Sequence, residues 1–295
     1  MTKPAIGFIG LGLMGAAMVE RLQSRGYAVT ALANTNRTGI DAALARGATE
    51  AANGREVAET SDIVMLCMGT SDHVESRMRG GDGVIAGLSA GKVVIDFGTS
   101  LPASTTALGE EVAQTGAVML DAPLGRTPSH AKDGLLNIMA SGDTGTYERI
   151  RPVLDDLGEN VFHLGPLGSG HTIKLINNFF AMTCANAMSE AFAVCDVAGV
   201  PRQALYDVLA AGPNHSGMMD FVKAYAIDGD PEKLAFTVRN ALKDISYYDK
   251  MVSDSGRASI MAKCAKSAIG RAVEDGHGDD LVPQMVDNFS RWFAD

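Results

Sequence analysis

The sequence has little cysteine, and the cysteines it has are scattered. The four residues Cys67, Cys184, Cys195 and Cys264 form no CxxC pair, and no group of histidines and cysteines has the spacing of zinc ligands. This pattern argues against a fold held by disulfides and against a metal site. We therefore expect reduced, mostly buried thiols, no metal ion and a cytoplasmic location.

The sequence also lacks a basic stripe, a run of like charges and a long hydrophobic segment. Its 295 residues carry 25 Lys and Arg against 35 Asp and Glu, a net charge of −10. Nucleic acid and anionic membranes are therefore poor partners, and no segment is long enough to span a bilayer. The apolar run at residues 5–19 resembles a signal peptide only superficially, because it holds four glycines and continues directly into Glu20 and Arg21.

The remaining composition, with 46% hydrophobic and 20% charged residues, is that of a globular protein of about two domains. Its first motif is glycine-rich. A short apolar strand, residues 6–9, leads into Gly10-x-Gly12-x-x-Gly15, and a helix and a second strand at 27–33 follow. Gly10 allows a tight turn, Gly12 lets the backbone approach a pyrophosphate, and Gly15 lets the helix pack closely on the strand. We interpret the segment as a dinucleotide-binding motif, and a glycine-rich turn without a ligand is the alternative.

The loop after the second strand indicates which cofactor is bound. NAD binding usually needs an acidic residue there, but this loop contains Asn36, Arg37 and Thr38 and reaches its first acid only at Asp41. A guanidinium beside amide and hydroxyl groups suits a 2′-phosphate, so the loop favours NADP, with NAD as the alternative. Arg37 could also be a solvated loop charge.

The rest of the chain changes character near its middle. Apolar strands are predicted at 63–68, 92–97, 117–121, 137–141 and 161–164, and helices at 171–198, 202–211, 234–255 and 260–275. We predict an α/β Rossmann-type dinucleotide-binding domain (1–164) followed by an all-α domain (165–295) for substrate binding and oligomerisation. The polar strand ends near Met68 and Thr99 are candidate ligand walls, because ligands bind beyond the carboxyl ends of such strands.

The helix that starts near residue 171 carries three polar residues on one face. Lys174, Asn177 and Asn178 stand at i, i+3 and i+4 within an apolar sequence. They are either a solvated helix face or a site in which a partly desolvated ammonium exchanges a proton with a substrate. A nucleotide-binding motif upstream favours the second interpretation.

These motifs together resemble the β-hydroxyacid dehydrogenase family, which includes 3-hydroxyisobutyrate dehydrogenase and tartronate semialdehyde reductase. The resemblance rests on GFIGLGLMG (7–15), CMGT (67–70), DFGTS (96–100), GSGHTIKLINN (168–178) and the pair Lys243-Asp244. It implies a Rossmann domain and an oligomerising helical domain with the active site between them. It also implies cofactor contacts from Gly10, Gly12, Leu13, Met14, Gly15, Asn36, Arg37, Thr38, Met68, Thr99 and Lys243. Lys174 is then the catalytic proton donor or acceptor, and Asn178 positions the substrate hydroxyl or carbonyl.

One loop departs from the family pattern. Most members have a Ser-Gly-Gly type substrate loop, whereas this chain has Leu124-Gly125-Arg126-Thr127, which looks like the variant of sulfolactaldehyde reductases. A guanidinium fork can meet two oxygens of a carboxylate or sulfonate at once. The resemblance implies that Arg126, with Gly125, Thr127 and Asn177, binds the anionic end of the substrate, and that Thr99 contributes where cofactor and substrate meet. Ala181 stands where that subgroup would carry a hydroxyl residue, so a carboxylate semialdehyde is an equal alternative.

We therefore predict an NAD(P)-dependent oxidoreductase that interconverts a short acidic semialdehyde and its hydroxy acid. Apolar surface on the helical half predicts a homodimer or homotetramer. Two alternatives are a non-catalytic nucleotide-binding sensor or scaffold and an imine reductase of similar architecture, and the presence of Lys174 disfavours both. No histidine receives a role, although His130 and His171 could fall near the site.

Overall fold

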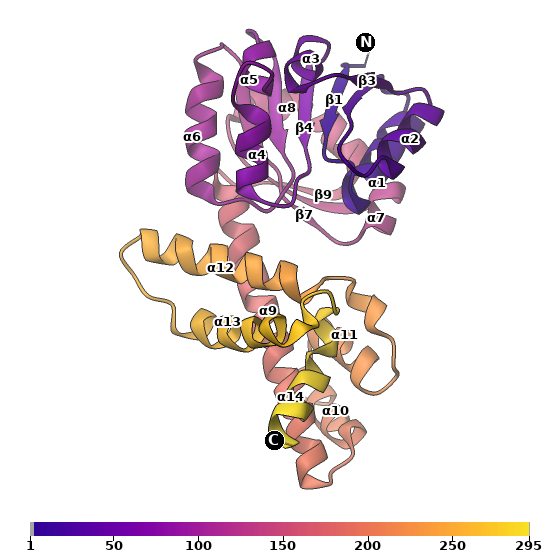
Figure 1. Cartoon of the computed structure of the whole chain (residues 1–295), viewed down its shortest axis with the longest axis vertical. Helices are drawn as coiled ribbons and strands as arrows, with labels where there is room; N and C mark the ends of the chain where they lie inside the picture. The colour runs from indigo at the N-terminus through magenta and orange to yellow at the C-terminus, as the bar shows by residue number, and fades with distance from the viewer. Residues whose placement is uncertain (1–2, 295) are drawn as a thin grey trace. The chain divides into compact units, whose positions relative to one another are not determined.

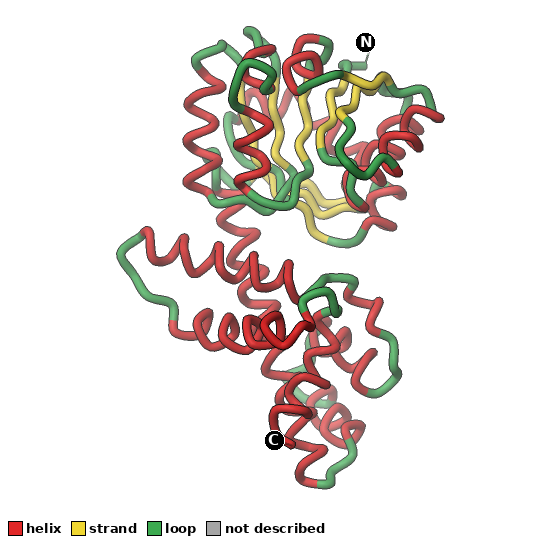
Figure 2. Tube along the Cα trace, viewed as in Figure 1, coloured by secondary structure: helices red, strands yellow, loops and turns green. Residues whose placement is uncertain are grey.

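The computed structural model describes residues 3–294. The chain divides into two compact units, one ending at Lys174 and one beginning at Leu175, and the division falls inside helix α9 (Ser169–Ala198; Figure 1). All strands of the described residues lie in the first unit, and the second unit is built of helices (Figure 2). The predicted fold class is confirmed. The predicted domain limits, 1–164 and 165–295, stay a prediction.

A six-stranded parallel sheet forms the centre of the first unit. Its strands are β1 (Ile6–Ile9), β2 (Val29–Leu32), β3 (Thr49–Ala51), β4 (Ile63–Leu66), β5 (Val93–Asp96) and β6 (Val118–Asp121). Their order is β3-β2-β1-β4-β5-β6, and in register Phe8 pairs with Ala31 on one side and Met65 on the other. This is the Rossmann strand order. From β1 the chain adds strands first on one side, β2 and β3, and then on the other side, β4 to β6. Ligands of such sheets bind where the order reverses, between β1 and β4, beyond the carboxyl ends of the strands.

Helices cover both faces of this sheet. They are α1 (Leu13–Ser24), α2 (Thr38–Ala45), α3 (Gly54–Glu59), α4 (Ser71–Met78), α5 (Val84–Gly87), α6 (Pro102–Ala113), α7 (Pro128–Asp133) and α8 (Thr144–Leu157). Strands β1, β4 and β5 are buried along their whole length, which agrees with their runs of apolar residues, broken only by the buried Asp96 at the end of β5.

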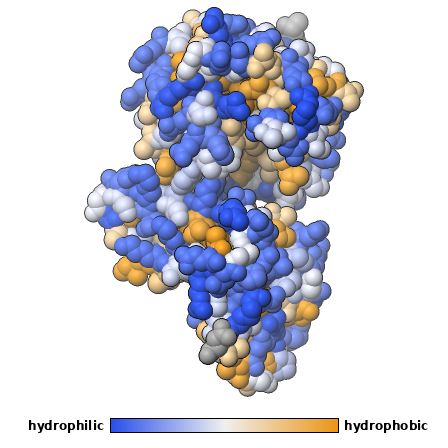
Figure 3. All heavy atoms as spheres, in the orientation of Figure 1, coloured by the Kyte–Doolittle hydropathy of each residue, from blue (hydrophilic) through white to orange (hydrophobic). Residues whose placement is uncertain are grey.

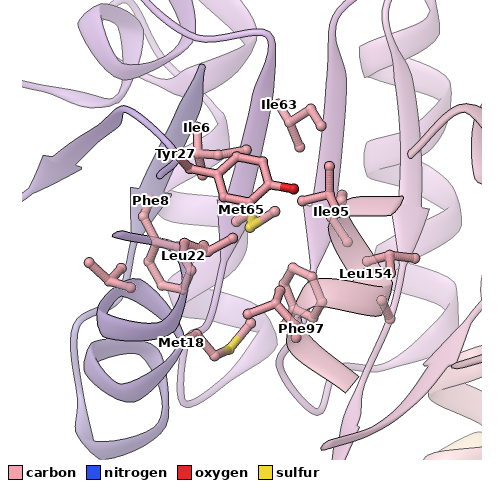
Figure 4. Close-up of a cluster of buried hydrophobic side chains, with 14 of the residues drawn as sticks. Ile6, Phe8, Met18, Leu22, Tyr27, Ile63, Met65, Ile95, Phe97 and Leu154 are labelled. Atoms are coloured by element: carbon pink, nitrogen blue, oxygen red, sulfur yellow. The ribbon is translucent and has the colours of Figure 1, made fainter. Parts of the chain in front are cut away.

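Successive residues of the central strands belong to different cores. Ile6 and Phe8 of β1 pack on the α1 and α8 side, where Figure 4 shows Phe8 beside Met18 and Leu22. Ile9 belongs to the core on the α3 to α6 side. Phe8 is fully buried, so its replacement by alanine would cost about 3–5 kcal/mol.

A second, three-stranded sheet completes the first unit. It contains β7 (Leu124–Gly125), β8 (Leu136–Ala140) and β9 (Gly158–His163), with β7 antiparallel and β9 parallel to β8. The strands predicted at 137–141 and 161–164 are β8 and β9, shifted by one to three residues. The two-residue β7 and the edge strand β3 were not predicted.

The second unit packs its helices around one core of its own. After α9 it contains α10 (Arg202–Ala210), α11 (Gly217–Ala226), η1 (Pro231–Leu234), α12 (Val238–Asp254), α13 (Ile260–Ala272), η2 (Val273–His277), η3 (Val282–Gln284) and α14 (Met285–Ala294). Helix α9, about 45 Å long, contributes Phe192 to this core, and α12 contributes Ile245.

Two of these helices, α11 and α14, were not predicted, and two predicted helices need correction. The helix predicted at 234–255 is wrong at its start, because residues 235–237 are not helical and α12 begins at Val238. The Thr237 side chain caps α12 by accepting from Asn240 N at 3.3 Å. The helix predicted at 260–275 keeps its α-helical form only to Ala272.

The four cysteines are free thiols. Three are half-buried and Cys264 is exposed, so the expectation of mostly buried thiols was wrong. In the part of the chain that the structure describes, no helix is both long enough and apolar enough to cross a membrane.

Candidate functional site

The glycine motif forms the turn between β1 and α1. Gly10 has φ +102°, a conformation that favours glycine. A Cβ on Gly15 would lie 1.9 Å from the Gly10 carbonyl oxygen, so only glycine lets α1 pack this closely. Gly12 is the N-cap residue of α1, and no side chain caps the helix there. The N–H groups at the start of α1 are thus available to an anion such as a pyrophosphate.

A pocket of about 500 Å³ opens beside this turn. Its lining brings together four of the predicted cofactor residues, Gly10, Gly12, Asn36 and Met68. The other lining residues are Leu11, Leu32, Asn34, Ile40, Cys67, Gly69, His73, Ser76 and Arg77. They come from the ends of β1, β2 and β4 and from α2 and α4, so the pocket lies at the reversal point of the strand order.

Three predicted cofactor residues of α1, Leu13, Met14 and Gly15, do not line this pocket. Leu13 is 86% exposed, and Met14 packs against the core on the α1 side of the sheet.

Arg37 lies outside the pocket and is held by two carboxylates. Its two terminal nitrogens each lie 2.9 Å from Glu50, and Nη2 also lies 3.0 Å from Asp41. The guanidinium lowers the pKa of Glu50 through this hydrogen bond. Thr38 N donates to Asn36 Oδ1 at 2.9 Å, which fixes the start of α2.

The turn after β5 carries Thr99, which is half-buried. Asp96 Oδ1 accepts from Gly98 N at 2.8 Å, and Asp96 Oδ2 accepts from Ser100 Oγ at 2.7 Å. These two bonds fold the turn around the buried carboxylate. They hold Thr99 at the carboxyl edge of the sheet, the edge to which Gly10 and Met68 also belong.

The loop after β7 holds Arg126 in a strained backbone conformation. Its φ is 77°, and it is the only described residue other than glycine with a positive φ. Its Nη1 donates to Leu135 O at 2.6 Å and lies 2.5 Å from Glu159 Oε2. The next residue, Thr127, contacts His130 Nδ1 through its hydroxyl at 2.7 Å. Gly125 pairs with Asn137 in the second sheet.

A fully buried polar cluster lies where β6 meets the start of α9. Asp121 accepts backbone hydrogen bonds from Gly168 and His171 and a side-chain hydrogen bond from Ser141. The His171 ring contacts Thr105 Oγ1 at 2.8 Å and lies 3.7 Å from Asp121 and 3.7 Å from Asp96. The cluster therefore connects the start of α9 to the ends of β5 and β6.

The polar face of α9 continues from this cluster. Lys174 is half-buried and belongs to the first unit. In the second unit, Asn178 is buried and donates to Asp244 Oδ2 at 2.6 Å, and Asn177 donates to Asn178 Oδ1 at 3.2 Å. Asp244 Oδ1 lies 2.9 Å from Lys243 Nζ. Asp244 thus joins two predicted site residues, Asn178 and Lys243.

Sequence reasoning missed Arg77, Asn34, Asp121 and Asp244. Arg77 lines the pocket, and its Nη2 lies 3.5 Å from Asn34 Oδ1. Arg77 could have been found from the sequence, because it lies in the helix that follows the polar Gly-Thr-Ser end of a predicted strand. Within residues 3–294, no group of three or more His, Cys, Asp or Glu side chains could hold a metal ion.

Two family models match most of the chain. A model for the NAD binding domain of 6-phosphogluconate dehydrogenase matches residues 5–165, and a model for the NAD-binding of NADP-dependent 3-hydroxyisobutyrate dehydrogenase matches residues 168–287.

Three curated relatives are similar at about 30% identity. The 2-(hydroxymethyl)glutarate dehydrogenase of Eubacterium barkeri is 30% identical over 92% of this chain and 96% of its own. The NAD-dependent L-serine dehydrogenase of Pseudomonas aeruginosa is 31% identical over 96% and 97%. The 3-sulfolactaldehyde reductase of Escherichia coli is 32% identical over 72% of each chain.

Solved structures share the fold. A 3-hydroxyisobutyrate dehydrogenase of Mycobacterium tuberculosis with L-serine has a TM-score of 0.85 at 23% identity, covering 97% of this chain and 99% of that one. An imine reductase of Myxococcus stipitatus with NAD+ has a TM-score of 0.66 at 21% identity, covering 98% and 99%. Because both activities occur on this fold, the fold alone does not separate them.

Proposed function

The chain belongs to the β-hydroxyacid dehydrogenase family, and from this premise we propose that it interconverts a short acidic semialdehyde and its hydroxy acid. The chain is an NAD(P)-dependent dehydrogenase, with relatives that are dehydrogenases and reductases of hydroxy acids and semialdehydes. The proposal adds the substrate class and the residues that act. The observation that carries it is the placement of Lys174. Its helix starts at the carboxyl edge of the sheet, where the glycine turn and Thr99 also lie.

The pocket at the glycine turn fits the adenosine and pyrophosphate part of the cofactor. The N–H groups at the uncapped start of α1 would hold the pyrophosphate, and the apolar Leu32, Ile40 and Met68 would line the adenosine side. When bound, the nicotinamide would supply or accept the hydride. We place Lys243 next to the nicotinamide, as the family resemblance implies, and Thr99 at the junction between cofactor and substrate.

We propose a preference for NADP over NAD. Arg37 is the cation of the loop after β2, and that loop offers no acid for a ribose hydroxyl. A 2′-phosphate would have to compete with Glu50 and Asp41 for the Arg37 guanidinium. Arg77, which lines the pocket, is a second cation available to the same phosphate.

We propose that Lys174 carries the proton of the reaction. Its ammonium would donate a proton to the oxygen of the carbonyl group as that group is reduced and take the proton back in the reverse direction. Asn178 would hold that oxygen in place by hydrogen bonding. Asp244 orients the Asn178 amide, because it accepts from Nδ2 and leaves Oδ1 to accept from Asn177. General acid–base catalysis of this kind contributes about 10²–10⁴-fold in rate.

We assign the anionic end of the substrate to Arg126, with Gly125, Thr127 and Asn177. The contacts that hold the Arg126 guanidinium both use Nη1. Nη2 and Nε therefore remain as donors for an anion in the described structure. A sulfonate, as in 3-sulfolactaldehyde, and a carboxylate both fit a guanidinium fork, so we propose both as candidates for the anionic group.

We propose that the protein is a homodimer or homotetramer. Hydrophobic side chains reach the surface of the helical unit in several patches, some of which are orange in Figure 3. Exposed apolar side chains of that unit include Phe180, Val197, Val208 and Ile260, at 68–77% exposure. Such a surface suits contact with a second copy of the chain.

One assay tests the proposal. The oxidation of NADPH and of NADH is followed with 3-sulfolactaldehyde, tartronate semialdehyde and methylmalonate semialdehyde, for the unchanged protein and for Lys174→Ala and Arg126→Ala. We expect turnover of at least one aldehyde, a loss of about 10²-fold or more in kcat for Lys174→Ala, and a raised KM for Arg126→Ala. Full activity of Lys174→Ala would refute the proposed chemistry. An unchanged KM for Arg126→Ala would refute the anion anchor alone.

A further inference from the structure

We propose that Asp121 and Ser141 are positioning residues for Lys174, because they fix the first turn of the helix that carries it. The inference rests on the proposed role of Lys174. All three residues belong to the first unit.

Asp121 is the last residue of β6 and is fully buried. Its Oδ1 accepts from Gly168 N at 2.8 Å, and its Oδ2 accepts from His171 N at 2.7 Å. One carboxylate thus holds two successive points of the start of α9. A negative charge at a helix N-terminus is also favourable to the helix dipole.

Ser141 is equally buried and completes the arrangement. Its hydroxyl donates to Asp121 Oδ1 and accepts from Gly170 N at 2.9 Å. The backbones of Asp121 and Ser141 also pair with each other, at 3.2 Å and 2.7 Å. The two acceptors are therefore fixed relative to each other by both backbone and side chain.

The four N–H groups at the start of α9 are all accounted for. Gly168 and His171 donate to Asp121, Gly170 donates to Ser141, and Ser169 donates to Pro166 O at 3.1 Å. The first intrahelical bond follows from Thr172 N to Gly168 O at 3.0 Å. Because a rigid helix continues from these points, they set where Lys174 lies, three residues after His171.

The start of α9 packs so closely that Gly170 has no room for a side chain. A Cβ on Gly170 would lie 2.2 Å from Met139 O and 2.8 Å from Asp121 Oδ2. The helix start is therefore pressed against the end of β8 and the Asp121 carboxylate. A displacement of about 1 Å at a reacting group can cost 10²-fold in rate, so a loosened α9 should slow the reaction before it weakens nucleotide binding.

The test compares Ser141→Ala and Asp121→Asn with Asp156→Asn. Asp156 is a matched control, because it is a carboxylate of the same unit that accepts from Tyr27, Lys3 and Arg25 and contacts none of the residues above. For each variant, kcat, the KM of the aldehyde, the Kd of NADPH, the solvent deuterium isotope effect on kcat and the melting temperature are measured.

We expect Ser141→Ala to lower kcat about tenfold and Asp121→Asn about 10²-fold, with the Kd of NADPH changed less than threefold. The solvent isotope effect should rise, because proton transfer from a displaced Lys174 becomes slower than the other steps. Asp156→Asn should keep the kcat of the unchanged protein even if its melting temperature falls as much as those of Ser141→Ala and Asp121→Asn.

The inference is overturned if Ser141→Ala and Asp121→Asn keep kcat within twofold, or if kcat and the Kd of NADPH worsen together by the same factor. If Asp121→Asn does not fold, the milder Ser141→Ala decides. Lys174→Ala, measured in parallel, distinguishes failure of this inference from failure of the proposed function. Loss of activity in Lys174→Ala with normal kcat in both Ser141→Ala and Asp121→Asn overturns only this inference. Normal activity in Lys174→Ala overturns the proposed function as well.

Discussion

At the scale of single residues, Arg126 combines an unfavourable backbone with a proposed substrate contact. An L-residue in the left-handed region costs roughly 1–2 kcal/mol relative to a right-handed one, and glycine does not carry this cost. Strain of this kind persists where the surrounding structure enforces it, and it clusters at functional sites. Glycine would suit the backbone of this loop, and an arginine occupies the position instead.

Replacing Arg126 by glycine and by alanine separates the backbone from the side chain. Both variants lose the guanidinium, so the KM of the acidic aldehyde should rise about 10- to 100-fold in both, the equivalent of about 1.5–3 kcal/mol. Arg126→Gly should be more stable than Arg126→Ala by about 1 kcal/mol, because only alanine keeps a Cβ at φ 77°. Urea unfolding measures the difference. Equal stabilities would mean that this backbone conformation stores no strain.

Glu50 is a second residue whose charge should matter for the cofactor. It holds the Arg37 guanidinium that we assign to the 2′-phosphate. Glu50→Gln should therefore raise the ratio of kcat/KM for NADPH over NADH about threefold to fivefold, the size of one surface ion pair. Arg37→Ala should lower the same ratio. A ratio unaffected by both changes would assign the preference to other residues, with Arg77 as the next candidate.

At the scale of elements, Asp156 of α8 accepts hydrogen bonds from Lys3, before β1, and from Arg25 and Tyr27, after α1. Burial alone would raise the pKa of this carboxyl, but hydrogen bonds from Tyr27, Lys3 and Arg25 outweigh burial and lower it. A lowered pKa in the folded state stabilises the protein above the unfolded-state pKa, about 3.9. This contribution is lost as the pH falls through the folded-state value.

Asp156→Asn should consequently destabilise the first unit at pH 7, and the difference from the unchanged protein should shrink below about pH 4. Chemical unfolding at a series of pH values measures this. A difference that stays constant from pH 7 to pH 3 would show that the loss comes from packing and not from the charge of the carboxylate.

Most elements of the first unit that form an apolar run or an alternating apolar pattern could be predicted from the sequence. Strands β1 and β4 contain no polar side chain, and β5 is apolar up to its last residue, Asp96. The edge strand β3, Thr49–Ala51, has two exposed residues and no apolar run, so it carried no signal. Helix α11 could also have been predicted, because Ser216 stands as an N-cap residue before a helical pattern.

The candidate site was predictable to a similar extent. Local motifs gave the glycine turn and the polar face of α9. The acceptors at the start of α9 could not be found this way. Asp121 lies 20 residues from Ser141 and 50 from His171 in the sequence, so only the folded chain brings them together. Asp244 lies 66 residues from Asn178 for the same reason.

At the scale of the whole molecule, each unit has its own hydrophobic core. The sheet of the first unit is packed on both faces, and the second unit has a separate core that draws on α9, α11, α12, α13 and α14. Units with their own cores commonly unfold as separate cooperative transitions. The chain offers a probe for one of them, because its single tryptophan, Trp292, lies on α14 and packs against Phe289.

We predict that a nucleotide fragment stabilises one unit selectively. ADP-ribose 2′-phosphate carries the adenosine and pyrophosphate of NADP without the nicotinamide, so its contacts should be confined to the pocket at the glycine turn. At 100 times its Kd it should stabilise the first unit by about 2.7 kcal/mol, which calorimetry would show as an upward shift of one transition. Trp292 fluorescence should report the other transition at an unchanged temperature. A joint shift of both signals would mean that the two units unfold as one, and no shift at all would argue against the pocket as the nucleotide site.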